Sequence, residues 1–129
     1  MADVLVADDD KPIRDALCIL LEGEGYQVTE AESGAEALRI IRTHPRRLIV
    51  LLDNMMPKMT GLEVLRTIAT DPAFNERHAY FLVTAARRVT RELHGLPSDF
   101  AVTVIHKPFD IQEIVTAVEA AAHRLAAGA

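Results

Sequence analysis

Short apolar runs alternate with longer stretches in which apolar residues recur every three or four positions. Each run is typical of a β-strand, and each longer stretch is typical of an amphipathic helix. The apolar runs lie at residues 4–7, 27–31, 48–52, 79–83 and 101–105. The run at 48–52 is entirely aliphatic, a pattern typical of a strand buried on both faces at the centre of a parallel sheet.

Side chains that can cap helices mark the start of several helical stretches. Ser33 and Thr60 are each followed three residues later by glutamate, the spacing of a capping box, so a helix is expected after each. Asp10 and Asp110 are expected to cap the first and last helices. The helical pattern at residues 86–94 is followed by glycine and proline, which predicts a short or displaced fourth helix.

Five strands that alternate with five helices predict an α/β fold. Right-handed crossovers between parallel strands would place helices on both faces of the sheet. The chain has 129 residues, of which 50% are hydrophobic, and this suits one domain with a single core. No linker or low-complexity stretch divides the sequence, so a single domain over residues 1–129 is expected.

Charge and cysteine content argue against several classes of protein. The net charge of −5 disfavours a surface for nucleic acid or for an anionic membrane, because both need clustered lysine and arginine. The single cysteine, Cys18, cannot form an internal disulfide, which fits a reducing compartment. No signal-peptide pattern is visible, and no apolar run approaches the roughly 20 residues of a membrane span. A cytoplasmic location is therefore expected.

Polar side chains stand at or just after the ends of four predicted strands. They are Asp8 and Asp9, then Asp53, then Thr84, then Lys107. Because parallel strands end at the same edge of a sheet, these groups are expected to converge. Neighbouring carboxylates repel each other and titrate as a coupled set, and a divalent cation such as Mg²⁺ removes that repulsion. Carboxylates, a metal, a lysine and a hydroxyl together suit the binding of a phosphoryl group.

Each of these side chains has a plainer explanation when it is taken alone. Asp53 is in a position where aspartate often begins a turn, and Lys107 fits an ordinary surface position. Thr84 fits a β-branched strand residue, and the acids near Asp8 fit a solvated loop. The coincidence of four such strand ends favours the functional interpretation.

The same residues form the pattern of a known signalling family. The motifs are the acidic pair Asp8-Asp9, Asp53-x-x-Met56-Pro57 with Gly61, Thr84-Ala85, and Lys107-Pro108-Phe109. In this order, they make the chain resemble a response-regulator receiver domain of two-component signalling, of the stand-alone single-domain type, over essentially all 129 residues. The resemblance implies a flavodoxin-like (βα)5 doubly wound parallel sheet with strand order 2-1-3-4-5.

The resemblance also implies a metal site. Asp9 is similar to the carboxylate that binds the metal directly, and Asp8 to the one that acts through water. Asp53 would be a further ligand, and Met55 would contribute its backbone carbonyl. The implied ion is Mg²⁺, with Mn²⁺ as an alternative.

Chemical roles follow from the resemblance in the same way. Asp53 resembles the phosphoacceptor, which attacks a phosphohistidine or a small acyl phosphate. Lys107 resembles the lysine that pairs first with this aspartate and then with a phosphoryl oxygen. Thr84 resembles the switch hydroxyl that is drawn toward the phosphoryl group. A cis peptide bond before Pro108 is also implied.

Three small or apolar residues are expected around the phosphoryl group. Ala85 leaves room for it to enter, and Met55 and Ala86 flank it without a polar side chain that would position a hydrolytic water. Slow loss of the phosphoryl group is therefore expected. The chain departs from the family at Val104, where an aromatic residue usually precedes the lysine by three positions, and this puts the usual coupling to the threonine in doubt.

The implied partners are a sensor histidine kinase or a histidine phosphotransfer protein, and a protein target that the sequence does not identify. Homodimerisation on phosphorylation is a further expectation, and no reaction on a separate substrate is expected. Two alternatives stay open. One is a degenerate receiver that binds partners without phosphorylation. The other is a small phosphatase of the haloacid-dehalogenase type, suggested by Asp8 to Asp10 but disfavoured by Pro12.

Overall fold

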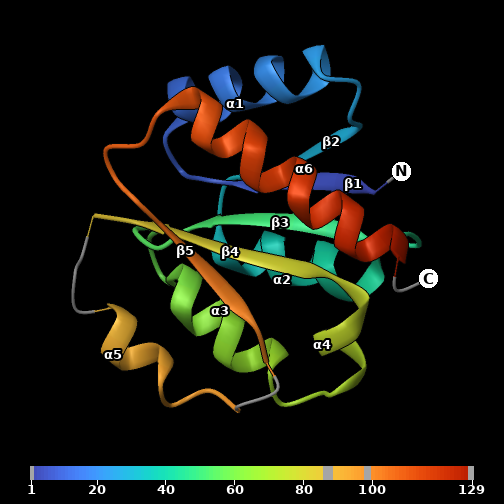
Figure 1. Ribbon diagram of the computed structural model, residues 1–129. Coiled ribbons are helices and arrows are strands. Elements are labelled where there is room, and N and C mark those ends of the chain that lie inside the picture. The colour runs from blue at the N-terminus through green and yellow to red at the C-terminus, as the bar shows by residue number, and fades with distance from the viewer. Residues whose placement is uncertain (1, 86–88, 98–99, 128–129) are drawn as a thin grey trace.

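The computed structural model describes residues 2–85, 89–97 and 100–127 of the chain (Figure 1). One parallel sheet forms the middle layer, and helices lie on both sides of it. The elements in chain order are β1 (Asp3–Ala7), α1 (Lys11–Gly23), β2 (Val28–Ala31), α2 (Gly34–Thr43), β3 (Leu48–Asp53), α3 (Gly61–Ile68), α4 (Ala73–Arg77), β4 (Ala79–Thr84), α5 (Val89–Leu93), β5 (Val102–His106) and α6 (Ile111–Ala127). Within these described ranges, no helix is long and apolar enough to span a membrane.

The sheet has five strands in the order β2-β1-β3-β4-β5, and every neighbouring pair is parallel. β3 lies at the centre, where Val50 is opposite Leu5 of β1 on one side and Tyr80 of β4 on the other. All six residues of β3 are buried, as its aliphatic run predicts. This is the flavodoxin-like strand order that the resemblance implies, and the predicted fold class is confirmed.

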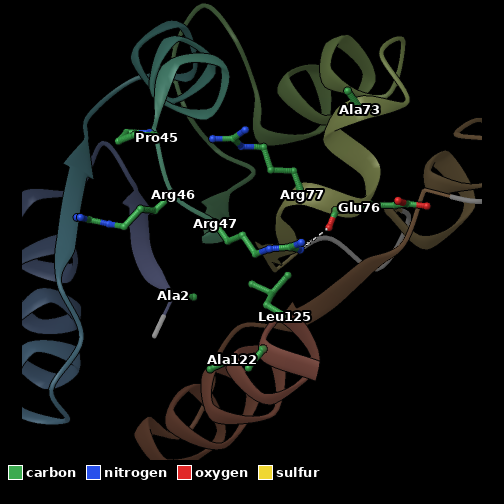
Figure 2. Close-up of a pocket in the computed structure, with 10 residues that line it drawn as sticks. Ala2, Pro45, Arg46, Arg47, Ala73, Glu76, Arg77, Ala122 and Leu125 are labelled. Atoms are coloured by element: carbon green, nitrogen blue, oxygen red, sulfur yellow. Dashed lines mark hydrogen bonds between the residues drawn. The ribbon is translucent and has the colours of Figure 1, made fainter. Parts of the chain in front are cut away.

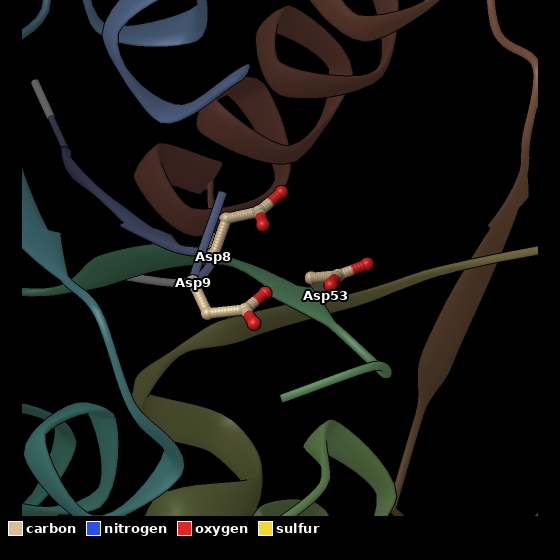
Figure 3. Close-up of side chains that lie close together, drawn as sticks. All are labelled: Asp8, Asp9 and Asp53. Atoms are coloured by element: carbon tan, nitrogen blue, oxygen red, sulfur yellow. The ribbon is translucent and has the colours of Figure 1, made fainter. Parts of the chain in front are cut away.

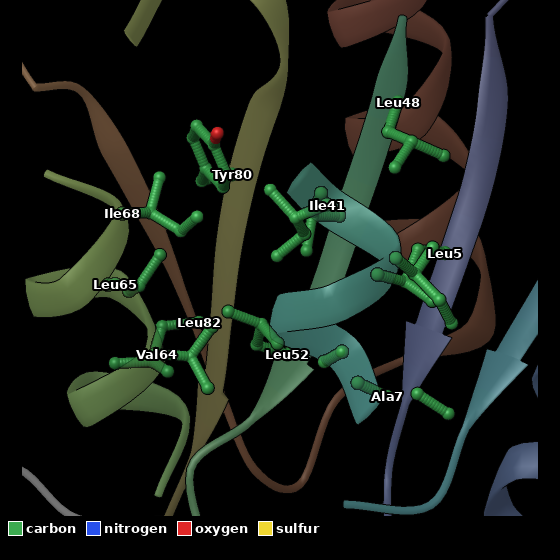
Figure 4. Close-up of a cluster of buried hydrophobic side chains, with 14 of the residues drawn as sticks. Leu5, Ala7, Ile41, Leu48, Leu52, Val64, Leu65, Ile68, Tyr80 and Leu82 are labelled. Atoms are coloured by element: carbon green, nitrogen blue, oxygen red, sulfur yellow. The ribbon is translucent and has the colours of Figure 1, made fainter. Parts of the chain in front are cut away.

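Apolar side chains alternate between the two faces of the sheet and form a separate cluster on each. On one face, Leu5 and Leu52 pack with residues of α2 and α3, including Ile41 and Leu65 (Figure 4). On the opposite face, Phe81 packs with apolar residues of α1 and α6. Each fully buried aliphatic side chain stabilises the fold by about 1.5–3 kcal/mol, so the two clusters fix the sheet on which the strand ends stand.

The predicted helix caps are present. The side chains of Thr60 and Glu63 form a reciprocal capping box at the start of α3. Ser33 accepts a hydrogen bond from the backbone N–H of the residue three positions ahead, at 3.2 Å, and begins α2. Asp10 and Asp110 accept similar bonds, at 3.4 Å and 2.9 Å, at the starts of α1 and α6. Local chemistry therefore fixes where these helices begin.

One short helix differs from the prediction, and another matches it in the part that the structure describes. The apolar pattern does not predict α4, a single turn that begins after Pro72, because a five-residue helix shows almost no periodicity. The N–H of Ala73 donates to Asp71 Oδ1 at 3.0 Å, and the Tyr80 hydroxyl donates to the Phe74 carbonyl at 2.9 Å, which ties the turn to β4. The predicted fourth helix is short, as expected, and covers Val89–Leu93; the first part of its predicted span, residues 86–88, lies outside the described residues.

Arginines connect α4 to the α2–β3 loop at the edge where the strands begin (Figure 2). Arg47 donates to the carbonyl of Glu76 at 3.1 Å, and Arg77 donates to the carbonyl of His44 at 2.6 Å. Both carbonyls lie at or near the C-terminal ends of helices, where a positive charge is favourable. Arg46 binds the Asp3 carboxylate at 2.9 Å. The three arginines line a pocket of about 660 Å³. Their hydrogen bonds join neighbouring segments of the chain, so we assign them a structural role.

A buried histidine closes the same edge of the core. His78 accepts a hydrogen bond from the Leu48 N–H at 2.9 Å and contacts the Ile41 carbonyl through its other ring nitrogen at 3.1 Å. Burial lowers the pKa of His78 to about 4, so the ring is neutral at neutral pH and has one donor and one acceptor nitrogen. The ring therefore joins α2, β3 and the start of β4.

Candidate functional site

The carboxyl ends of the strands bring the predicted site residues to one edge of the sheet. Asp53 ends β3 and Thr84 ends β4, while Asp8 follows β1 and Lys107 follows β5. Hydrogen bonds between strands extend past these ends. The Asn54 N–H donates to the Val83 carbonyl, and the Lys107 N–H donates to the Thr84 carbonyl, both at 2.9 Å. The backbone that carries the site is therefore a continuation of the sheet.

Three carboxylates converge at this edge (Figure 3). Asp8, Asp9 and Asp53 each offer one oxygen atom, and these oxygens lie within 4.8 Å of one another. Asp8 and Asp53 are both only 4% exposed, whereas Asp9 is exposed. Two of the three negative charges are therefore removed from water and face each other at short range, which is unfavourable without a compensating cation.

Lys107 supplies a positive charge from the protein itself. Its ammonium lies 2.8 Å from Asp53 Oδ1, and the two side chains are 27% and 5% exposed. The contact is an ion pair, and Lys107 acts on Asp53 through both hydrogen bonding and charge. An ionised carboxylate has about four lone-pair sites, so Asp53 can still accept a further positively charged partner.

Burial and charge shift the pKa values of the cluster in a consistent direction. Burial raises the pKa of Asp53 above its ordinary value of 3.8, Lys107 opposes that rise, and the Asp9 charge adds to it. Burial also raises the pKa of Asp8, and the Asp53 charge contributes to the same effect. Burial alone would lower the pKa of Lys107, but the Asp53 carboxylate beside it raises that pKa overall. The lysine therefore stays charged.

The donor set fits a hard divalent cation. Clustered carboxylate oxygens with open access to water through Asp9 match the ligands that Mg²⁺ takes, and a cation there would offset the repulsion between Asp8 and Asp53. Met55 comes two residues after Asp53, and its side chain is 70% exposed. A hydrogen bond from the backbone N–H of Met55 partly opposes the rise that burial causes in the pKa of Asp53. The role predicted for the Met55 carbonyl stays a prediction.

The loop after β3 is shaped by a residue that the sequence analysis did not single out. Asn54 Oδ1 accepts from the N–H of Leu62 at 3.0 Å, and the Asn54 carbonyl accepts from Gly61 at 3.3 Å and from Met56 at 3.1 Å. The start of α3 is thus tied directly to the residue after Asp53. The signal in the sequence was weak, because asparagine is common in any loop.

The remaining predicted residues lie at the same edge or outside the described part. Thr84 is fully buried at the end of β4, and Ala85 after it is exposed. Ala86 lies outside the described residues. The Lys107–Pro108 peptide bond is cis, as the resemblance implies. Val104 is half-buried in β5, opposite Leu82 of β4, so no aromatic side chain occupies that position.

The fold is that of a flavodoxin-like α/β protein, and acidic strand ends beside a lysine form the kind of site that suits a phosphoryl group and a metal. Residues 4–119 match the family described as the response regulator receiver domain. The chain therefore belongs to the response regulator receiver domains of two-component systems.

Several known proteins are similar to this chain. It is 34% identical over 121 residues to the response regulator MprA of Mycobacterium sp. (strain KMS), and 35% identical over 121 residues to the DNA-binding response regulator MtrA of Mycobacterium leprae (strain TN). Each match covers 94% of this chain, and the chain spans about half the length of these relatives, 50% and 51%.

Solved structures show the same relationship. The receiver domain of the Francisella response regulator 1452 has a TM-score of 0.81 and 29% identity, over 96% of this chain and 98% of that one. The signal receiver domain of a signal transduction histidine kinase from Syntrophus aciditrophicus has a TM-score of 0.80 and 25% identity, over 98% and 92%.

The contact between α3 and the Asp53 backbone can be tested at Gly61. A Cβ atom there would lie 2.7 Å from the Asp53 carbonyl oxygen and 2.8 Å from Leu82 Cδ1. We expect Gly61→Ala to lower the free energy of unfolding by about 1–3 kcal/mol, because the backbone at Asp53 must move. Urea denaturation measures the loss, and amide chemical shifts of Asp53 and Asn54 report the displacement.

Gly23→Ala is the matched control. Gly23 is the last residue of α1, and a Cβ there would meet nothing within 4 Å. Its free energy of unfolding should stay the same or rise slightly, since alanine favours helix over glycine. Equal stability of the two variants, with unchanged shifts at Asp53, would contradict the close contact.

Proposed function

We propose that the chain is a phosphoacceptor switch in which Asp53 takes a phosphoryl group with the help of Mg²⁺. The proposal depends mainly on the groups that surround the Asp53 carboxylate. The carboxylate is nearly buried, two other carboxylates offer oxygens within 4.8 Å, and the Lys107 ammonium is 2.8 Å away. The acids suit a divalent cation, and the lysine suits a phosphoryl oxygen.

In the proposed reaction, a carboxylate oxygen of Asp53 attacks the phosphorus of a phosphohistidine. The new O–P bond forms as the P–N bond breaks, and the electron pair of that bond returns to the imidazole, which leaves. A carboxylate is a weak nucleophile, so the rate depends on in-line positioning and on charge compensation. Bound Mg²⁺ would supply positive charge at the oxygens of the phosphoryl group. Lys107, whose ammonium lies 2.8 Å from Asp53 Oδ1, would transfer its ion pair to one of those oxygens.

The switch itself would begin at Thr84. Its side chain is fully buried at the end of β4, beside the strand that carries Asp53. We propose that its hydroxyl turns toward the phosphoryl group. Val104 provides no aromatic ring that could move together with Thr84. We therefore infer that the conformational change is transmitted through the connection from β4 to α5.

The proposed partners are proteins. A sensor histidine kinase or a histidine phosphotransfer protein would donate the phosphoryl group, and an unidentified protein would be regulated, with dimerisation on phosphorylation as one route. DNA binding is named for MtrA as a whole, of which this chain spans about half. The net charge of −5 supports a protein target rather than nucleic acid for the residues present.

The organisation and location of the chain are proposed on the same basis. We infer that residues 1–129 form a single receiver domain, because each strand and helix described packs on one sheet. A single, buried Cys18 supports a reducing compartment such as the cytoplasm.

The phosphoacceptor can be identified with acetyl phosphate and Mg²⁺. We expect intact-mass spectrometry to show the addition of one phosphoryl group per chain, and its loss in Asp53→Asn, because the amide is not a nucleophile. Asp15→Asn is the control, since Asp15 lies on α1 in a surface ion pair with Lys11. Continuous release of phosphate without a stable adduct would indicate a phosphatase, and no adduct at all would indicate a degenerate receiver.

The lifetime of the phosphoryl group tests the apolar residues expected around it. Once acetyl phosphate is removed, we expect the adduct of the wild-type protein to decay slowly, over hours rather than minutes. Met55→Asn should shorten this lifetime, because an amide can hold a hydrolytic water where the thioether cannot. Decay within minutes in the wild-type protein, or no change in Met55→Asn, would contradict this role of Met55.

A further inference from the structure

Arg14 carries the most deeply buried positive charge in the part of the chain that the structure describes. It lies in the first turn of α1 and is only 8% exposed, which is unusual for arginine. Removing a guanidinium from water is unfavourable unless its N–H groups find partners. The partners of Arg14 therefore indicate what it does.

One of these partners is the backbone of the acidic pair. Arg14 Nη1 donates to the Asp8 carbonyl oxygen at 2.7 Å, in a buried contact. Arg14 Nε donates to the Glu30 carboxylate at 3.1 Å, and the Glu30 side chain is 49% exposed. The guanidinium therefore joins α1, the end of β1 and the edge strand β2.

The Asp8 carbonyl belongs to the peptide group that links Asp8 to Asp9. A peptide group is planar, so holding its oxygen restrains the peptide plane and the positions of the two Cα atoms that carry the acidic side chains. The other contacts of the turn do not reach this oxygen. The Asp8 N–H donates to the Ala31 carbonyl at 3.0 Å, and the Asp10 N–H donates to Asp8 Oδ1 at 2.9 Å. In the described residues, Arg14 makes the hydrogen bond that orients this peptide.

We propose that Arg14 is a positioning residue, which holds the Asp8–Asp9 peptide so that both carboxylates point at a bound divalent cation. The proposal rests on the proposed function of the same site. The side-chain hydrogen bonds that Arg14 makes within the described residues go to Asp8 and Glu30, and none goes to Asp53. It acts through the backbone, and groups of this kind around metal ligands typically change metal affinity by about 10–100-fold when they are removed.

A purely structural role is the competing explanation, because Arg14 also ties α1 to β2 through Glu30. Glu30→Ala removes this tie and leaves the contact with the Asp8 carbonyl possible. Arg14→Met removes both contacts while keeping an unbranched apolar side chain in place of the arginine methylene groups. The comparison of these two variants therefore separates positioning of the acidic pair from stabilisation of the fold.

The experiment measures the dissociation constant of Mg²⁺ by isothermal titration calorimetry with magnesium chloride. We expect Arg14→Met to bind about tenfold more weakly than the wild-type protein. Glu30→Ala should change the affinity by less than about twofold, whatever it does to the melting temperature. Arg14→Lys should be intermediate, because its ammonium can reach the carbonyl without the fixed geometry of the guanidinium.

A second readout separates affinity from chemistry. With acetyl phosphate, the Mg²⁺ concentration for half-maximal phosphorylation should rise in Arg14→Met, while the rate at saturating Mg²⁺ should approach that of the wild-type protein. A fold defect alone would not shift this concentration selectively.

The outcomes are distinct. Any folded Arg14 variant that binds Mg²⁺ as tightly as Glu30→Ala overturns the positioning role. If Arg14→Met does not fold, Arg14→Lys and Arg14→Gln decide by the same comparison. If the wild-type protein itself neither binds Mg²⁺ nor accepts a phosphoryl group, the proposed function fails, whereas normal wild-type behaviour with unaffected Arg14 variants overturns only this inference.

Discussion

Repulsion among carboxylates at one edge of the sheet is the constraint on which the rest of the site depends. In a parallel sheet the carboxyl ends of all strands lie at the same edge. Asp8, Asp9 and Asp53 are therefore close together, and each has an oxygen within 4.8 Å of those of the other two. Burial disfavours the charged forms of Asp8 and Asp53 and so raises their pKa values. Lys107 compensates one charge and leaves an excess of negative charge. A bound divalent cation, as proposed above, would offset this excess.

The fold keeps this unfavourable cluster in place by rigid means. β3 is buried along its whole length and carries Asp53 at its end, and the core clusters on the two faces of the sheet fix its position. Gly61 lets α3 approach the Asp53 backbone closely, and Asn54 ties the intervening loop to that helix. Such support matters because preorganised charges contribute to phosphoryl transfer only if they do not move away.

The sequence predicts the sheet and the strand ends well, because both follow from strong local patterns. The aliphatic run before Asp53 and the capping residues at Ser33 and Thr60 are unambiguous. The sequence does not predict α4, which is too short to show periodicity. Nor does it indicate Arg14, because an arginine on an amphipathic helix is normally exposed, and only the packed structure brings it to the Asp8 carbonyl.

The central claim is that repulsion among the three carboxylates destabilises the fold until a divalent cation binds. Its most direct test is the melting temperature of the wild-type protein and of Asp8→Asn, without and with Mg²⁺. Because the pKa of Asp8 is higher in the folded state than its ordinary value, its charged form destabilises the metal-free fold at neutral pH. Asp8→Asn, which can still accept from the Asp10 N–H, should therefore melt a few degrees higher without Mg²⁺. Mg²⁺ should raise the melting temperature of the wild-type protein and have a much smaller effect on the variant. Equal melting temperatures without Mg²⁺ and equal responses to it would contradict the account.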